Sequence, residues 1–312
     1  MNIPKKCFNA ISIGQAALNT IRQNQYGQVH SVFDRTFNIL FGGELVGVGL
    51  NNVSLSPIDM IADIPNTDSM LKLGIKKGMK VEFKSNQLMV GDLMVILLKG
   101  VKSWHPATKV ELPHGLEEIT RNLELAKRAA VVHYRIEGLG QLLPEVDRIF
   151  EGQLPAIENL NEFAKESLPH TIKLLKSARC ADITGVKKSA ENLIGLGLGL
   201  TPSADDMLVG FTSSLWWISH SLNKGLDTVH QINEAVVFRV ERTNLLSRQL
   251  LRHAAKGEVN EHLTELLEGV LSRTTSDIGK LVEKIMEIGE TSGLDMTLGI
   301  LFGIRLGVEI TK

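Results

Sequence analysis

Residues 193–210 read LIGLGLGLTPSADDMLVG, and this stretch predicts a helix that begins directly after a glycine-rich loop. Thr201 can cap the first N–H groups of such a helix, and Pro202 suits its first position because proline has no N–H to leave unpaired. The acidic pair Asp205 and Asp206 falls in or near the first turn, where the helix dipole favours negative charge. Helix-start chemistry alone therefore explains these polar residues.

Helix-start chemistry does not explain the alternating glycines Gly195, Gly197 and Gly199. Glycine loses more conformational freedom on folding than any other residue. A glycine-rich loop that enters a helix N-terminus often brings backbone N–H groups against an anion. The spacing matches neither a dinucleotide-binding fingerprint nor a P-loop. The stretch therefore predicts a ligand with an anionic end, whose N–H groups the aspartates can hold. The aspartates acting as a base, or holding a divalent metal, are open alternatives.

A second segment repeats this pattern 89 residues further along the chain. Residues 203–210 read SADDMLVG and residues 292–299 read SGLDMTLG, so that Asp206 is matched by Asp295. Both segments open an apolar run. We expect two loop–helix starts that face one pocket.

The second of these helices carries a glycine at every fourth position. Gly299, Gly303 and Gly307 lie on one helix face, because residues four apart are neighbours on the helix surface. Such a stripe predicts a close approach to another helix. The segment between the two repeats holds Thr243 and Ser247 on one helix face, with Arg248 as a natural partner for carboxylate or phosphate.

The order of sequence patterns predicts two domains of different class. Residues 29–40 and 44–50 flank Gly42–Gly43 and read as a hairpin, and strand-like runs continue over 79–98 after a short helix near 69–73. From residue 112 the apolar period is helical. The expected fold class is α+β. A β-rich, barrel- or sandwich-like domain over 1–110 precedes a larger helical domain over 111–312, which carries the glycine-rich loop.

Composition excludes several classes of function. The formal net charge of the 312 residues is −1, divided into +5 over the first 110 residues and −6 over the rest, so no electrostatic case exists for nucleic-acid binding. No apolar run reaches the roughly 18–20 residues of a membrane span. The two cysteines exclude a disulfide framework and suit a reducing cytoplasm, where we expect the protein. No His/Cys/Asp cluster has zinc spacing.

Three segments carry a resemblance to a known family. GLGLGLTPSADDMLVG over 195–210, TNLLSRQLLRHAAKGEV over 243–259 and TSGLDMTLGILFG over 291–303, after a β-rich first third, resemble the AllH-like subunits of bacterial oxamate carbamoyltransferase. The resemblance implies conversion of oxalurate and phosphate to oxamate and carbamoyl phosphate, in allantoin and purine catabolism. It also implies that the chain acts with two other subunits.

The resemblance completes the set of candidate site residues. The catalytic candidates are Asp206, Asp295 and Asp205. The substrate-binding candidates are Gly195, Gly197, Gly199, Thr201, Ser203, Thr243, Ser247, Arg248, Thr291, Ser292 and Gly293. The family pattern has Pro where Leu198 stands, Gly where Ala204 stands and His where Glu290 stands. These departures bear on which substrate is used.

Three functions compete at this point. The first is a subunit of a carbamoyltransferase, with a carboxylate or carbamoyl compound and phosphate as ligands and other subunits as partners. The second is a non-catalytic subunit that binds an anion or carboxylate or supports assembly. The third is a metal-dependent enzyme that uses the paired aspartates. No organic cofactor is expected.

Overall fold

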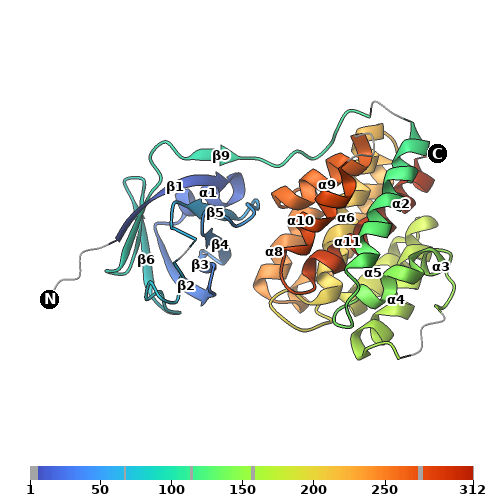
Figure 1. Ribbon diagram of the computed structural model, residues 1–312, viewed down its shortest axis with the longest axis horizontal. Coiled ribbons are helices and arrows are strands. Elements are labelled where there is room, and N and C mark those ends of the chain that lie inside the picture. Colours follow the sequence, from blue (N-terminus) through green and yellow to red (C-terminus); the bar gives the residue numbers. More distant parts are fainter. Residues whose placement is uncertain (1–5, 67, 113–114, 156–158, 273–276, 312) are drawn as a thin grey trace. The chain divides into compact units, whose positions relative to one another are not determined.

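The structure is a computed structural model that describes residues 6–66, 68–112, 115–155, 159–272 and 277–311. It separates into two compact units, residues 1–106 and 107–312 (Figure 1). The first unit is β-rich and the second is helical, so the expected α+β class is confirmed.

The first unit is a β-barrel. Its strands are β1 (Lys6–Gly14), β2 (Tyr26–Val32), β3 (Thr36–Phe41), β4 (Glu44–Gly49), β5 (Asp59–Ala62), β6 (Lys80–Lys84), β7 (Gln87–Val90), β8 (Met94–Leu97) and β9 (Lys102–Trp104). The pairing order β5-β4-β3-β2-β6-β7-β8-β1 closes because β1 also pairs with β5. Of the two architectures left open by the sequence, the structure therefore has the barrel.

The long first strand is what closes the barrel. Residues 6–9 of β1 pair in parallel with β8, and residues 10–13 pair antiparallel with β5. β9 then adds in parallel beside residues 12–14. Closure removes the exposed sheet edges that would otherwise invite aggregation.

Turn glycines and one short helix complete this unit. The hairpin expected around Gly42–Gly43 is confirmed, since β3 and β4 pair from Thr36–Gly49 to Phe41–Glu44 and both glycines have positive φ. A helix that we did not expect, α1 (Gln15–Gln23), buries Ala17, Leu18 and Ile21. The prediction of a helix near 69–73 is wrong, because the structure has only turns there, held by hydrogen bonds such as that from Leu73 N to Ser69 O (2.8 Å).

The second unit consists of helices. They are α2 (Leu116–Val132), η1 (Gly140–Glu145), α3 (Val146–Phe150), α4 (Glu162–Arg179), α5 (Ile183–Leu193), α6 (Ser203–Leu222), α7 (Leu226–Val236), η2 (Val237–Arg242), α8 (Leu245–Ala254), α9 (Glu261–Ser272), α10 (Ile278–Met286) and α11 (Ser292–Ile310). α6 and α11 are buried along nearly their whole length and lie in the middle of the unit (Figure 1). Helices that are apolar on all sides are typical of such a central position.

Glycines let α6 and α11 pack backbone against backbone. A Cβ atom added at Gly299 would lie 1.9 Å from the Met207 carbonyl oxygen, and one at Gly210 would lie 2.0 Å from the Met296 carbonyl oxygen. Gly303 would meet the Phe211 carbonyl oxygen at 2.5 Å. The predicted close approach of the glycine stripe is therefore confirmed, and its partner is α6.

Candidate functional site

The first turns of α6 and α11 meet at one end of the pair. The Thr201 hydroxyl, just before α6, lies 3.1 Å from the hydroxyl of Ser292, the first residue of α11. Thr201 also donates a hydrogen bond to Asp206 Oδ2 (2.9 Å). The predicted meeting of the two loop–helix starts is confirmed.

The contacts between the two starts are reciprocal. The Ser292 hydroxyl interacts with Asp206, while the Ser203 hydroxyl, its counterpart in the repeat, interacts with Asp295. The glycine contacts cross in the same way, because Gly210 approaches Met296 and Gly299, the counterpart of Gly210, approaches Met207. The two repeats are thus related by an approximate internal two-fold axis. The serine of each helix start contacts the aspartate of the other.

Both carboxyl groups are buried, and this sets their proton affinity. Burial raises the pKa of Asp206 well above its ordinary value; the Ser292 and Thr201 hydroxyls oppose this shift, and the charges of Asp295 and Asp205 add to it. Burial raises the pKa of Asp295 to about 7, against the opposing effect of the Leu139 N–H and the Ser203 and Thr291 hydroxyls. Asp295 can therefore hold and release a proton near neutral pH.

The two carboxyl oxygens of Asp295 differ in their hydrogen bonding. Oδ1 accepts a hydrogen bond from the Leu139 N–H (2.7 Å). Oδ2 is buried and has no hydrogen-bond partner within the part of the chain that the structure describes. Neither Asp295 nor Asp206 is more than 1% exposed. Thr201, Ser292 and Thr291, whose hydroxyls contact these carboxyl groups, are partly exposed.

Asp205 points to a different set of partners. Its Oδ1 accepts the Gly195 N–H (2.8 Å), and its Oδ2 accepts the Thr243 hydroxyl. Burial raises the pKa of its carboxyl group, and contacts with Thr243, Gly195 and Ser247 lower it. Asp205 thus ties the glycine-rich loop to the start of α8. The predicted site residues therefore divide into two neighbouring groups.

The glycine-rich loop folds back over the start of α6. Gly195, Gly197 and Gly199 all have positive φ, and a Cβ atom at Gly197 would lie 2.4 Å from the Ser203 nitrogen. The Ala204 N–H donates to the Leu196 carbonyl oxygen (3.0 Å). The N–H groups of Gly195 and Ala204 are therefore used inside the protein, whereas the loop was expected to direct such groups toward a ligand. The apolar side chains of Leu198 and Leu200 on the loop are exposed.

For the remaining candidate residues, the packing and burial indicate a structural role more than a role in ligand binding. A Cβ atom at Gly293 would lie 2.0 Å from the Ile285 carbonyl oxygen, so glycine is needed there for packing against α10. Arg248 is partly exposed on α8, and its Nε is buried with no hydrogen-bond partner in the described chain. Ala204 is fully buried, and Glu290 is exposed.

Sequence reasoning missed the segment that covers Asp295. Gly138 has a φ of +66°, and a Cβ atom there would lie 2.8 Å from Asp295 Oδ2. Asn161 holds this segment by donating to the carbonyl oxygens of Ile136 and Gly138, both at 2.7 Å. The run Gly138-Leu139-Gly140 has the same alternation as the glycine-rich loop and was the available signal. Arg135 in this segment donates to the Glu290 carbonyl oxygen just before α11.

Asn244 was also missed, and it joins the loop to α8. Its Oδ1 accepts the Ser247 N–H (3.0 Å) and its Nδ2 donates to the Leu200 carbonyl oxygen (2.9 Å). We expect Asn244→Ala to lower the free energy of unfolding by about 1–2 kcal/mol, the usual cost of a lost N-cap. Asn192→Ala is the control, since within the described part of the chain the Asn192 side chain donates only to the Lys188 carbonyl oxygen of its own helix. Equal effects of the two changes in urea unfolding would contradict this role.

The described residues form neither a metal cluster nor a membrane-spanning helix. The described residues contain no group of three or more His, Cys, Asp or Glu side chains that could hold a metal ion. None of the helices described is long and apolar enough to cross a membrane.

Each of the two units is matched by a protein-family model. A family model described as the oxamate carbamoyltransferase subunit AllH matches residues 193–304, which include both helix starts. A model described as the AllH family N-terminal domain matches residues 9–103. No solved structure matches the chain.

Proposed function

This chain belongs to the AllH family of oxamate carbamoyltransferase subunits, and we propose that it helps convert oxalurate and phosphate to oxamate and carbamoyl phosphate. The proposal includes other subunits of the same enzyme as partners, and a role in allantoin catabolism. The observation that carries it is the reciprocal pair of buried carboxyl groups, Asp206 and Asp295, behind partly exposed hydroxyls.

The reaction requires the movement of one proton. An oxygen of hydrogenphosphate attacks the terminal carbamoyl carbon of oxalurate, and the bond from this carbon to the nitrogen of the oxamate part breaks. The leaving nitrogen takes up a proton, and the phosphate loses one. A group with a pKa near the working pH is suited to accept the proton that the phosphate loses and to donate a proton to the leaving nitrogen. Asp295, with a pKa of about 7, meets this requirement.

We assign the contact with the reactants to the hydroxyl groups. Thr201 and Ser292 touch Asp206 and each other, and Thr291 touches Asp295, so a proton can pass from the surface to the buried carboxyl groups through these hydroxyls. Two helix N-termini favour negative charge at the same place. Arg135, held at the Glu290 carbonyl, adds a positive charge beside α11. Carbamoyl transfer between such anions depends chiefly on positioning and charge stabilisation.

Removal of the Ser292 hydroxyl tests this assignment. In the enzyme assembled with its other subunits, we expect Ser292→Ala to lower the rate of carbamoyl phosphate formation about tenfold to a hundredfold, the range given by a lost hydrogen bond to a charged group. Ser272→Ala is the matched control, because among the described residues the Ser272 hydroxyl donates to the Glu268 carbonyl oxygen of its own helix (2.7 Å) and to no residue of the site. Its rate should equal that of the wild type.

A second candidate function is a binding or assembly subunit without catalytic residues. The burial of both carboxyl groups and the exposed Leu198 and Leu200 on the neighbouring loop favour it. Full activity of Ser292→Ala in an intact assembly would support this candidate and contradict the first. Loss of activity on treatment with a chelator, restored by a divalent metal, would instead favour the metal-dependent alternative.

A further inference from the structure

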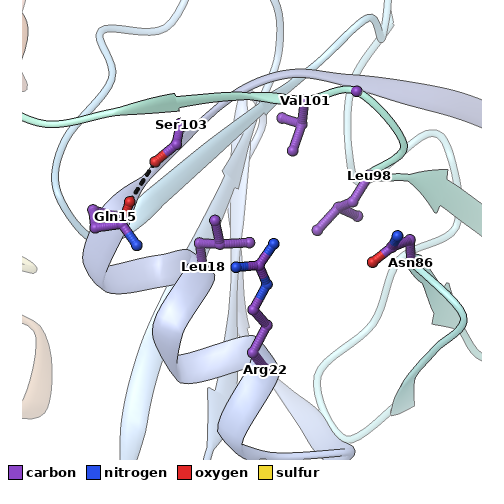
Figure 2. Close-up of a pocket in the computed structure, with 8 residues that line it drawn as sticks. Gln15, Leu18, Arg22, Asn86, Leu98, Val101 and Ser103 are labelled. Carbon is purple, nitrogen blue, oxygen red and sulfur yellow. Dashed lines mark hydrogen bonds between the residues drawn. The ribbon is translucent and has the colours of Figure 1, made fainter.

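The barrel unit contains a hollow that lies outside the site described above. It has a volume of about 350 Å³ and is formed by α1, the β6–β7 turn, the β8–β9 turn and β9 (Figure 2). Its lining residues are Gln15, Leu18, Arg22, Asn86, Leu98, Gly100, Val101 and Ser103. This volume is at the lower end of the range for small-molecule sites.

One side of the hollow is apolar, and on another side the polar side chains already form hydrogen bonds within the protein. Leu18 and Leu98 are buried, and Val101 is partly buried beside them. On the polar side, Gln15 Oε1 accepts the Ser103 hydroxyl (2.5 Å), and Gln15 Nε2 donates to Asn19 (2.8 Å). Gln15 and Ser103 therefore already satisfy each other.

Two other polar side chains of the hollow, Arg22 and Asn86, are exposed to solvent. Neither the Arg22 guanidinium nor the Asn86 carboxamide has a hydrogen bond or ion pair to any residue that the structure describes. Figure 2 shows Arg22 reaching from α1 to end beside Leu18, with Asn86 across from it. No acidic residue lines the hollow, and Lys99 and Lys102 stand next to its lining residues in the sequence.

We propose that this hollow binds a small carboxylate with an apolar body. The planar guanidinium of Arg22 matches the two oxygens of a carboxylate, and the Asn86 amide can donate a further hydrogen bond. The apolar side of the hollow then receives the apolar part of the ligand. The hydrogen bond from Leu98 N to the Asn86 carbonyl oxygen (2.8 Å) fixes the backbone of the turn that presents the Asn86 side chain across the hollow from Arg22.

A purely structural role for Arg22 makes a different prediction. Arg22 lies in the last turn of α1, where a positive charge complements the helix dipole. In that case the side chain needs no ligand, and a carboxylate compound should bind no better than its neutral amide.

Fluorine NMR titration of the full chain with 4-fluorobenzoate, and with 4-fluorobenzamide as the neutral counterpart, separates the two roles. We expect saturable binding of the carboxylate in the millimolar range and none of the amide. Asn86→Asp keeps the shape of the hollow and tolerates the positive φ of this position, but puts a negative charge opposite Arg22. It should weaken binding at least tenfold.

Arg35→Ala provides the control for a changed net charge. Arg35 also belongs to the barrel unit, but it donates to the Asn52 carbonyl oxygen (3.0 Å) and does not line the hollow. Its binding of 4-fluorobenzoate should equal that of the wild type. Equal binding of carboxylate and amide, undiminished binding by Asn86→Asp, or no binding by the wild type would each overturn the proposal.

Discussion

Gly299→Ala should destabilise the helical unit by at least about 3 kcal/mol, at the upper end of the cost of overpacking a core. The added Cβ atom would lie 1.9 Å from the Met207 carbonyl oxygen, which is backbone and cannot rotate away as a side chain does. α6 and α11 would have to separate by more than 1 Å to restore an ordinary contact of roughly 3.4 Å or more. Since a domain is stabilised by only about 5–15 kcal/mol in total, this loss is a large fraction.

Gly279→Ala is the matched control. Gly279 lies in α10, and a Cβ atom there would meet no atom of the described residues within 4 Å. This change should stabilise the protein by about 0.5–1 kcal/mol, because alanine is the better helix former. The free energy of unfolding by urea measures both variants. If Gly299→Ala proved as stable as Gly279→Ala, the two helices would not be in backbone contact.

Asp295→Asn should remove a large part of the pH dependence of stability. The pKa of Asp295 is raised from 3.8 to about 7 in the folded protein, so the folded state binds more protons than the unfolded state between these values. The stability that Asp295 contributes is therefore fully present below about pH 4 and is lost as the pH rises to 7. At roughly 1.4 kcal/mol per pKa unit, the loss is on the order of 4 kcal/mol. The raised pKa of Asp206 acts in the same direction.

Asparagine has the shape of a protonated aspartate and cannot ionise. Its carbonyl oxygen can still accept the Leu139 N–H, so the variant should match the wild type at low pH and exceed its stability at pH 8. Urea unfolding at pH 5, 6, 7 and 8 gives the comparison. Asp227→Asn, an exposed position in the first turn of α7, should follow the wild-type profile. Parallel profiles for Asp295→Asn and wild type would show that Asp295 keeps an ordinary affinity for protons.

The features predicted correctly from the sequence are those that depend on residues close together in the chain. Thr201-Pro202 and the repeated Asp-Met-x-x-Gly pattern located two helix starts, and the four-residue glycine spacing predicted a close helix contact. The β-rich first third followed by helical periodicity gave the order of the two units. α1 was missed because nine residues contain few turns of periodic pattern.

The features that were not predicted depend on distant contacts. Adjacent residues on a helix point about 100° apart, so Asp205 faces the start of α8 while Asp206 faces α11. Only the internal repeat distinguishes them in the sequence, because it pairs Asp206 with Asp295. The contact of Leu139 with Asp295 spans 156 residues, and no local pattern reports a contact of that separation.

The crossed contacts of α6 and α11 also constrain how the chain folds. Before the two helices dock, Asp206 and Asp295 are exposed to water and ionised at neutral pH, since the ordinary aspartate pKa is about 3.9. Docking buries both side chains and raises both pKa values, so it must be accompanied by proton uptake. The refolding rate of the helical unit should therefore increase as the solution is acidified from pH 8 toward pH 6, to the extent that the transition state already contains the docked pair.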